Sequence, residues 1–364
     1  MSAADEAGAV ADAEIAGLFA PCLLSGPVIL AVSGGADSTA LMVLACRWRQ
    51  GLSAGPELIV ATVDHGLRPD SRAEAQAVGA LARRLGLAHE ILVWDDEKPT
   101  TGIEAAAREA RYRLLAALAR RRRAAAIATA HTLDDQAETV LMRLAAGSGP
   151  AGLAGMRPRD VRNGVVVLRP FLGLRKRRLI ATLERYGIAW VEDPMNADPA
   201  FARPRLRAAA AALAREGLTP ERMARLAERI ARYEQVVAAA ARAARETLLD
   251  PARPGRFDGR VLLAVPEELA LRLIGEEIAA VCGKGRCTSA KPLRLKRLEA
   301  LWSELRAAIA AGRAMRRTLG GALISLDRDG CVLVRVAPRR RALPGRRGSA
   351  RRRNPAKDRF TKQR

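Results

Sequence analysis

The fold of this 364-residue chain is decided by one stretch, Ile29-Leu30-Ala31-Val32-Ser33-Gly34-Gly35-Ala36-Asp37-Ser38. Its aliphatic first part predicts a buried strand, which leads through a loop of small residues into a helix-forming segment at residues 39–49. Small residues let a loop backbone approach a phosphate group closely, and the following helix N-terminus offers unpaired N–H groups and the positive end of a dipole. The stretch therefore predicts a phosphate-binding loop between a strand and a helix.

An acid inside this loop, Asp37, sets it apart from the common phosphate loops. The loop has neither the Gly-Lys-Ser/Thr ending of a Walker A loop nor the glycine spacing of a dinucleotide fingerprint. A carboxylate is stable beside phosphate when a Mg²⁺ ion lies between them, and Ser33 and Ser38 add hydroxyl donors. We expect a metal–nucleotide site; the simpler alternative is a tight turn capped by serine and aspartate side chains.

The first half of the chain alternates aliphatic runs with alanine-rich helical patterns. Alternation of fully apolar strands with helices predicts an α/β fold: a Rossmann-like parallel sheet of about five strands with helices on both faces. The ligand crevice of such a sheet lies beyond the carboxyl ends of the strands. The expected strands are residues 28–32, 58–63, 89–93, 125–130 and 165–168, and the helices between them are residues 39–49, 71–85 and 104–122.

The pattern of residues changes from Gly217 onward, where the alternation of strand and helix patterns gives way to helical patterns. Thr219 and Pro220 form a helix start signal, and apolar residues then repeat at helical spacing to Val237. Two more helices are expected at 266–281 and 292–310, and two short apolar runs around Asp329-Gly330 predict a small hairpin. The predicted domains are a catalytic domain at 1–213, a mainly helical RNA-binding domain at 214–338 and a basic tail, expected to be disordered, at 339–364.

Charge points to a polyanionic partner. The formal net charge is +23, and residues 339–364 alone hold twelve Lys or Arg against one acid. Such an excess favours nucleic acid, although a solvated face plus a tail explains part of it. Neither a secretion signal nor an apolar run of membrane-spanning length is visible, and five scattered cysteines fit a reducing compartment. We expect a cytoplasmic protein without a membrane partner.

Three further segments carry polar residues where ligands are expected. Val63-Asp64-His65-Gly66-Leu67-Arg68 ends the second strand, and residues 131–139 open a helix after the fourth strand. Within the second segment, offsets of three and four residues place His131, Asp135 and Glu138 on one side of the helix. The third segment, residues 190–207, ends in three alternating arginines that suit phosphate groups: Arg203, Arg205 and Arg207.

The loop at 33–38 resembles that of the N-type ATP pyrophosphatases, the PP-loop superfamily, which split ATP into AMP and pyrophosphate. Together with the three further segments, roughly residues 28–210 resemble the tRNA(Ile)-lysidine synthetases. The resemblance implies that ATP adenylates C2 of the wobble cytidine in the CAU anticodon of tRNA(Ile), and that free lysine then displaces AMP to give lysidine. Two departures from the family pattern are Met195, where serine is usual, and Pro204, where asparagine is usual.

The resemblance also implies roles for individual residues. Asp37 and Asp135 are expected to coordinate Mg²⁺ and to perform acid–base chemistry, with Asp134 as a further catalytic candidate. Arg205 is the nearest match to the family's catalytic arginine, although Arg203 and Arg207 compete for that role. The expected ATP-binding residues are Ser33, Gly34, Gly35, Ala36, Asp37, Ser38, Asp64, His65 and His131.

Three questions stay open at the level of sequence. Arg108 and Arg111 share a helix face and suit either a nucleotide, the lysine carboxylate or solvent. The alternative functions are a PP-loop tRNA thiolase, which would need paired cysteines, and a non-catalytic ATP-gated RNA-binding protein, which would not need the acids. The sequence also leaves open whether the protein forms a homodimer.

Overall fold

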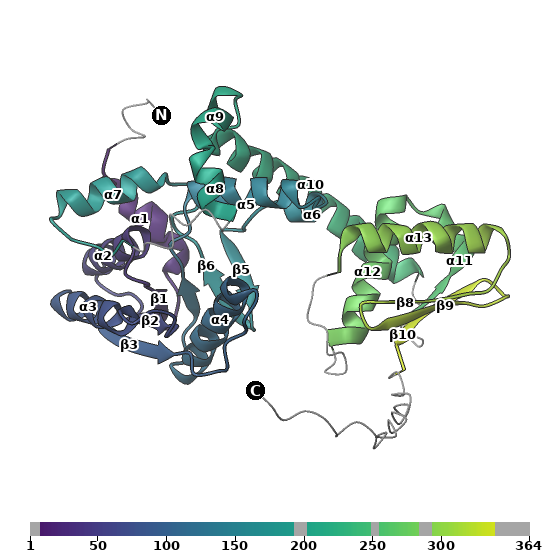
Figure 1. Ribbon diagram of the computed structural model, residues 1–364, viewed down its shortest axis with the longest axis horizontal. Coiled ribbons are helices and arrows are strands. Elements are labelled where there is room, and N and C mark those ends of the chain that lie inside the picture. The colour runs from purple at the N-terminus through teal and green to yellow at the C-terminus, as the bar shows by residue number, and fades with distance from the viewer. Residues whose placement is uncertain (1–7, 193–201, 249–254, 284–292, 339–364) are drawn as a thin grey trace, which may run out of the picture. The chain divides into compact units, whose positions relative to one another are not determined.

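The computed structural model describes residues 8–192, 202–248, 255–283 and 293–338 (Figure 1). It contains two compact units, Met1–Ala238 and Ala239–Arg364, each treated by itself below. The division between them falls inside the long helix α10, Pro220–Leu248. The domain boundary expected after residue 213 stays a prediction, and the predicted tail at 339–364 lies outside the described residues.

A six-stranded sheet forms the centre of the first unit, with the strand order β3-β2-β1-β4-β6-β5. Five strands are parallel, which confirms the predicted Rossmann-like α/β fold. The sixth, β5, is an antiparallel edge strand that the sequence analysis missed. The strands are β1 (Val28–Ala31), β2 (Leu58–Asp64), β3 (Ala88–Val93), β4 (Ala126–Ala128), β5 (Arg159–Arg162) and β6 (Val165–Leu168).

Both faces of this sheet are covered, and β1 shows why. Val28 and Leu30 are fully buried in one core, with α1, α2 and α7, whereas Ile29 is fully buried in another core with α4. Successive side chains of a strand point to opposite faces, so an unbroken aliphatic run requires cover on both. The helices of this unit are α1 (Asp12–Phe19), α2 (Ala36–Gln50), α3 (Ser71–Arg84), α4 (Ile103–Arg121), α5 (Leu133–Ala145), α6 (Pro150–Leu153), α7 (Lys176–Arg185), α8 (Ala202–Ala208) and α9 (Ala210–Arg215).

The parallel pairing brings the motif-bearing loops to one edge of the sheet. Ala31 at the end of β1 lies opposite Ala61 of β2, and Leu30 lies opposite Ala128 of β4. The loops after these three strands begin with Val32, His65 and Thr129, so all of them leave the sheet at its carboxyl edge. This edge is where a ligand crevice is expected in an open α/β sheet.

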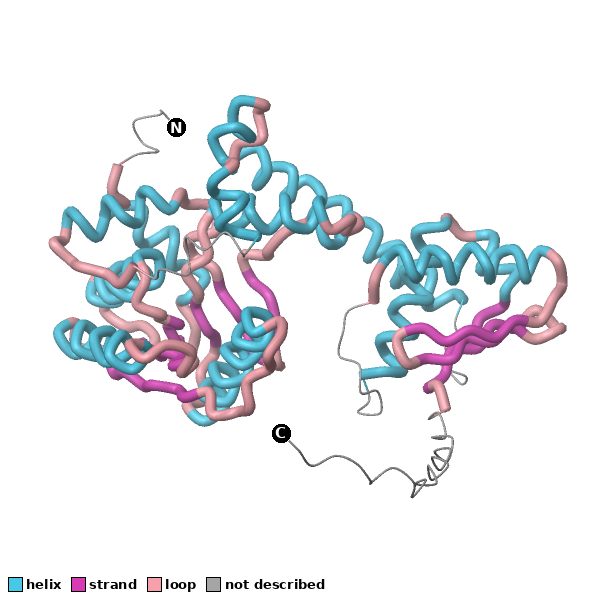
Figure 2. Tube along the Cα trace, in the orientation of Figure 1, coloured by secondary structure: helices cyan, strands magenta, loops and turns pink. Residues whose placement is uncertain are grey.

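The second unit is a four-stranded antiparallel sheet with helices packed on one face (Figure 2). The predicted hairpin is present as β9 and β10, but it is part of a larger sheet that also contains β7 and β8. Among the described residues, no helix combines the length and hydropathy needed to cross a bilayer. The elements are β7 (Arg256–Asp258), α11 (Gly259–Ala264), α12 (Glu267–Gly283), α13 (Leu295–Ala310), β8 (Met315–Leu319), β9 (Ala322–Leu326) and β10 (Cys331–Val336).

Candidate nucleotide and metal site

The loop between β1 and α2 owes its shape to Gly34, which has φ +95°. A Cβ atom there would approach the side chains of Val78 and Val191 at 3.4 and 3.5 Å, besides requiring a left-handed backbone. The carbonyl of Gly34 accepts hydrogen bonds from the Val191 backbone N–H at 2.9 Å and from Thr39 Oγ1 at 3.1 Å. The loop is therefore fixed both to its own helix and to the segment before residue 193.

Ser33 and Ser38 hold the loop closed. Ser38 Oγ accepts from the Ser33 backbone N–H at 3.1 Å and donates to the Gly35 carbonyl at 3.0 Å. The two serine hydroxyls also lie 3.2 Å apart. Gly35 is the N-cap of α2, so the first N–H groups of that helix have no carbonyl partner within it. The N–H groups at the start of α2 are therefore available for an anion, and phosphate binding by this loop stays a prediction.

Asp37, on the first turn of α2, has an unusual environment. Its side chain is 22% exposed, and Oδ2 lies 3.4 Å from Lys176 Nζ. Oδ1 is buried and accepts no hydrogen bond from the described residues. Burial raises the pKa of Asp37 to about 6; the Lys176 ammonium opposes this rise, and the Asp135 carboxylate adds to it.

Asp135 combines a structural contact with one that faces the site. Its Oδ2 accepts from the Thr132 backbone N–H at 2.8 Å and from Thr132 Oγ1 at 3.0 Å, in the capping box that begins α5. Its Oδ1 lies 3.9 Å from a guanidinium nitrogen of Arg207. Helix capping and a role in the site are therefore compatible for this residue.

The donor set at Asp37 and Asp135 fits a magnesium ion. Mg²⁺ is usually held by one or two carboxylates and completes its shell with waters and substrate phosphates. Asp37 Oδ1 is the kind of buried acceptor that a cation would satisfy, and the repulsion between Asp37 and Asp135 would be relieved by one. Within the described residues no cluster of three or more candidate ligands forms, so a resident metal cage is not built there.

Two of the three predicted arginines converge on the carboxylates. Arg207 donates to both oxygens of Glu138, at 2.6 and 3.2 Å, and Arg203 Nε lies 3.8 Å from the same carboxylate. Residues 203 and 207 are four positions apart on α8 and share a face, whereas Arg205 is exposed on another side of the helix. Arg205 stays a predicted catalytic residue. Pro204 is accommodated because it lies in the first turn of α8.

Asp134 does not share the contacts of Asp135. Its carboxylate binds the start of α7 instead. Its Oδ2 accepts from the Lys176 backbone N–H at 2.7 Å, and its Oδ1 lies 3.2 Å from Arg175 Nε. Arg175 in turn pairs with Glu221 at the start of α10. Asp134 thereby fixes the backbone of Lys176, the residue whose ammonium lies beside Asp37; its catalytic role stays a prediction.

The residues predicted to contact the nucleotide after β2 and β4 are also at this edge. Asp64 Oδ1 accepts from the Gly66 backbone N–H at 2.9 Å and from Ser71 Oγ at 2.8 Å; burial opposes ionisation, but these two hydrogen bonds lower the pKa of Asp64. Burial lowers the pKa of His65 to about 4, and its Nε2 accepts from Arg111 at 3.3 Å. Asp64 therefore shapes the turn after β2, and His65 connects this turn to α4.

His131 is held neutral at the end of β4. Its Nδ1 lies 2.9 Å from Thr129 Oγ1. Burial lowers the pKa of His131 to about 3, and the nearby guanidinium groups of Arg169, Arg108 and Arg203 act in the same direction. The imidazole offers a neutral donor or acceptor among cations. Burial and the Arg108 guanidinium lower the pKa of His131, and burial and Arg203 lower the pKa of Arg108, so Arg108 lies within electrostatic range of both; which of its three possible partners it meets stays open.

Lys176 and Glu138 are the residues that sequence reasoning undervalued. Lys176 begins α7 after the loop that follows β6, the fifth parallel strand, so the strand-end rule would have included this loop. Glu138 was placed on the correct side of α5 but received no role, because nothing in the sequence shows its bidentate contact with Arg207. Residues 193–201 of the predicted segment 190–207, which include Met195, lie outside the described residues.

The fold, the loop and the paired acids define the class of protein as a PP-loop ATP-binding domain, and residues 10–213 match the family described as PP-loop domain. The chain belongs to the tRNA(Ile)-lysidine synthase family. It is 55% identical over 320 residues to the tRNA(Ile)-lysidine synthase of Methylobacterium nodulans, which covers 87% of this chain and 92% of the relative. The Bradyrhizobium sp. BTAi1 protein of the same name is 47% identical, covering 91% of this chain and 96% of the relative.

A solved structure shares the fold. The U34-tRNA thiolase NcsA from Methanococcus maripaludis, described with its [4Fe-4S] cluster, aligns with a TM-score of 0.52 over 60% of this chain and 78% of that chain. The sequence identity is 18%, so this likeness concerns the fold alone. The thiolase alternative is not favoured by it.

Proposed function

We propose that this chain is a ligase that uses ATP to join the side-chain amine of free lysine to C2 of the wobble cytidine in the CAU anticodon of tRNA(Ile). ATP is converted to AMP and pyrophosphate in this reaction. One observation carries the proposal: a glycine-shaped loop holds an acid, Asp37, with a buried unsatisfied oxygen at the start of a helix. The identity to named tRNA(Ile)-lysidine synthases over most of the chain supports the same reaction.

In the first step, the loop N–H groups at the start of α2 bind the phosphates that will leave as pyrophosphate. Asp37 and Asp135 would hold Mg²⁺, which neutralises charge on the phosphates when bound. The Lys176 ammonium, 3.4 Å from Asp37, adds a positive charge at the same place. The C2 oxygen of cytidine then attacks the α-phosphorus, and the chain's role is to align the two groups in line.

In the second step, the amine of lysine must lose a proton before it attacks C2. The carboxylates of Asp37 and Asp135 are the candidates to accept that proton, because they are the acids that lie beside the loop. Glu138 is less available, since Arg207 holds both of its oxygens. As the carbon–nitrogen bond forms, the bond between C2 and its oxygen breaks, and that oxygen leaves as part of AMP. Adenylation therefore turns a ring oxygen that would otherwise stay into part of a good leaving group.

The reaction is tested with a tRNA(Ile) transcript, ATP and isotopically labelled lysine, followed by mass analysis of the nucleosides. We expect one lysine per modified cytidine and AMP in equal amount. A transcript with uridine at the wobble position is the matched control and should yield no product. Formation of ADP and inorganic phosphate instead would overturn the proposal.

The proposal also covers the location of the enzyme and its oligomeric state. We place the enzyme in the cytoplasm, where tRNA, ATP and free lysine are all available. The homodimer stays a prediction, which light scattering of the purified chain decides.

A further inference from the structure

The second sheet has one face that no helix of the described chain covers. Its other face carries the buried residues Phe257, Ile324, Val332 and Val334, which pack with α12 and α13. Strand residues alternate between faces, so their neighbours point to the uncovered side. That side is hollowed into an open basin of about 790 Å³.

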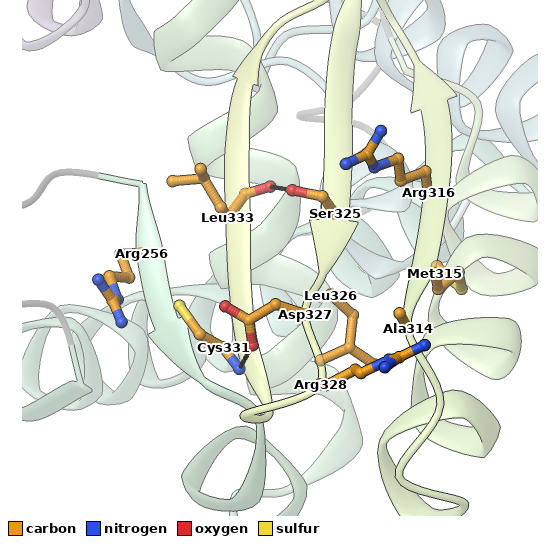
Figure 3. A pocket seen from close by; sticks show the side chains of 10 residues that line it. All are labelled: Arg256, Ala314, Met315, Arg316, Ser325, Leu326, Asp327, Arg328, Cys331 and Leu333. Atoms are coloured by element: carbon orange, nitrogen blue, oxygen red, sulfur yellow. Dashed lines mark hydrogen bonds between the residues drawn. The ribbon is translucent and has the colours of Figure 1, made fainter.

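Arginines stand at both margins of this basin. The ladder places Arg316 of β8 opposite Ser325 of β9, Ser325 opposite Leu333 of β10, and Leu333 opposite Arg256 of β7. Figure 3 shows Arg256 and Arg316 on either side of Leu333 and Ser325. Three strand spacings separate the two arginines, or about 14 Å. Arg328, in the turn before β10, adds a third guanidinium to the lining.

The acids beside these arginines accept hydrogen bonds from the backbone and keep their negative charge, without forming an ion pair with Arg256, Arg316 or Arg328 among the described residues. Asp258 Oδ1 accepts from the Arg260 backbone N–H at 2.8 Å, and Asp327 Oδ1 accepts from the Cys331 backbone N–H at 2.8 Å. Among the described residues, Arg256, Arg316 and Arg328 have no ion pair. Elsewhere in this unit, glutamates pair with the arginines of the helices and with one on β8: Arg245, Arg272, Arg306 and Arg317.

Three arginines against one acid, Asp327, give the lining a net positive charge, which suits a polyanion, and its residue types indicate which kind. It contains Ser325, Cys331 and Leu333 but no aromatic side chain that could stack on an unpaired base. Base-paired RNA keeps its bases stacked internally and is recognised by its shape and by phosphate contacts across the wide minor groove. Arg256 and Arg316, about 14 Å apart across Ser325 and Leu333, can contact phosphates of two different backbone segments without a contact to a base.

We propose that the uncovered face of this sheet binds the sugar–phosphate backbone of a base-paired stem of the tRNA. The proposal rests on the proposed function, because it takes tRNA as the substrate. Each arginine neutralises phosphate without reading sequence, so the face contributes affinity and orientation rather than selection of the anticodon.

The test compares two triple variants with equal loss of charge. The first is Arg256→Ala/Arg316→Ala/Arg328→Ala, and the control is Arg260→Ala/Arg294→Ala/Arg297→Ala, which removes three exposed arginines at α11 and α13. Equilibrium binding of tRNA(Ile) transcript is measured without ATP or lysine at several salt concentrations. The sheet variant should bind roughly tenfold or more weakly, and its slope of log affinity against log salt should be lower by about two to three.

The control variant should keep the wild-type slope to within about one. Equal weakening of both variants, or no change in the sheet variant, overturns the proposal. A version with Lys at the three sheet positions should recover most of the salt dependence, which separates lost charge from misfolding. Retained tRNA binding together with lost binding to vesicles of anionic lipid would also overturn it, in favour of a membrane surface.

This experiment and the test of the proposed function fail in different ways. Binding is measured without turnover, so a wild-type protein that makes no AMP would remove the proposed function while leaving the binding result intact. Conversely, unchanged binding by the sheet variant would remove the proposal for the sheet face and would say nothing against lysidine formation.

Discussion

In the first unit, Arg203 and Arg207 lie against Glu138 and Asp135, whereas in the second unit Arg256 and Arg316 line an open face without an acid partner among the described residues. The first arrangement fixes side chains in one geometry, because each guanidinium has a carboxylate to hold it. The second leaves positive charge available to solvent and to a mobile partner. Some arginines of this chain are therefore fixed by carboxylates, and others are available to a partner. The number of arginines in the sequence does not distinguish the two kinds.

The largest effect should come from the acid in the loop. Asp37→Asn should lower the rate of AMP formation by about a thousandfold or more, because it removes the negative charge that would hold Mg²⁺ beside the phosphates. Single-turnover measurements of AMP on tRNA(Ile) transcript check this. Asp96→Asn, which changes an exposed carboxylate of the same unit, is the control and should retain wild-type activity.

The same variant should be more stable than the wild type when magnesium is absent. Because burial raises the pKa of Asp37 to about 6, the folded state holds its proton more tightly than the unfolded state does. That contribution to stability is complete below the ordinary pKa near 3.8 and is lost as the pH rises through 6. At pH 7.5 the variant should gain roughly 1–3 kcal/mol in the free energy of unfolding. A urea titration that shows it to be less stable would contradict the burial argument.

A comparison of the neighbouring acids sharpens the division between site and scaffold. Asp135→Asn should lower kcat by about a hundredfold, because its carboxylate faces Arg207 and influences Asp37. Asp134→Asn should lower kcat by less than about tenfold, since an amide oxygen can still accept from the Lys176 backbone N–H. Equal losses in both variants would show that Asp134 contacts substrate.

The pH dependence should follow Asp37. The value of kcat/KM reports ionisations of the free enzyme, so it should fall as the pH falls through about 6, where this carboxylate becomes protonated. His131 and His65 should not contribute, because burial lowers their pKa values to about 3 and 4. A profile that stays flat down to pH 5 would remove Asp37 from the first step.

The smallest effect concerns the basic tail. A chain that ends at residue 338 loses a net charge of 11 and should bind tRNA with a shallower salt dependence, at unchanged kcat for saturating tRNA. Binding isotherms at four salt concentrations measure the slope. An unchanged slope would leave the sheet face, rather than the tail, as the source of the salt dependence.

The parallel sheet was predictable because its five strands are short aliphatic runs between helical patterns. Among the described residues, the three strands that escaped prediction lie at sheet edges and are polar: β5 reads Arg-Asp-Val-Arg, β7 reads Arg-Phe-Asp, and β8 has polar residues at 316–318. For β5 a signal was present, since Asn163-Gly164 links it to β6 with both residues at positive φ. Asp37 and Asp135 were singled out by their motifs, and their roles stay predictions. The contacts of Lys176 and Glu138 depend on packing between distant segments, which no local pattern encodes.

The hydroxyl of Ser38 bonds both to the start and to the middle of its loop, and Thr39 closes a further bond to Gly34. These bonds restrain the loop through the chain's own groups, and under the proposed function the restrained loop is the receptor for the triphosphate. A preorganised receptor loses little conformational entropy on binding, so more of the interaction with triphosphate remains available for affinity and for strain at the α-phosphorus.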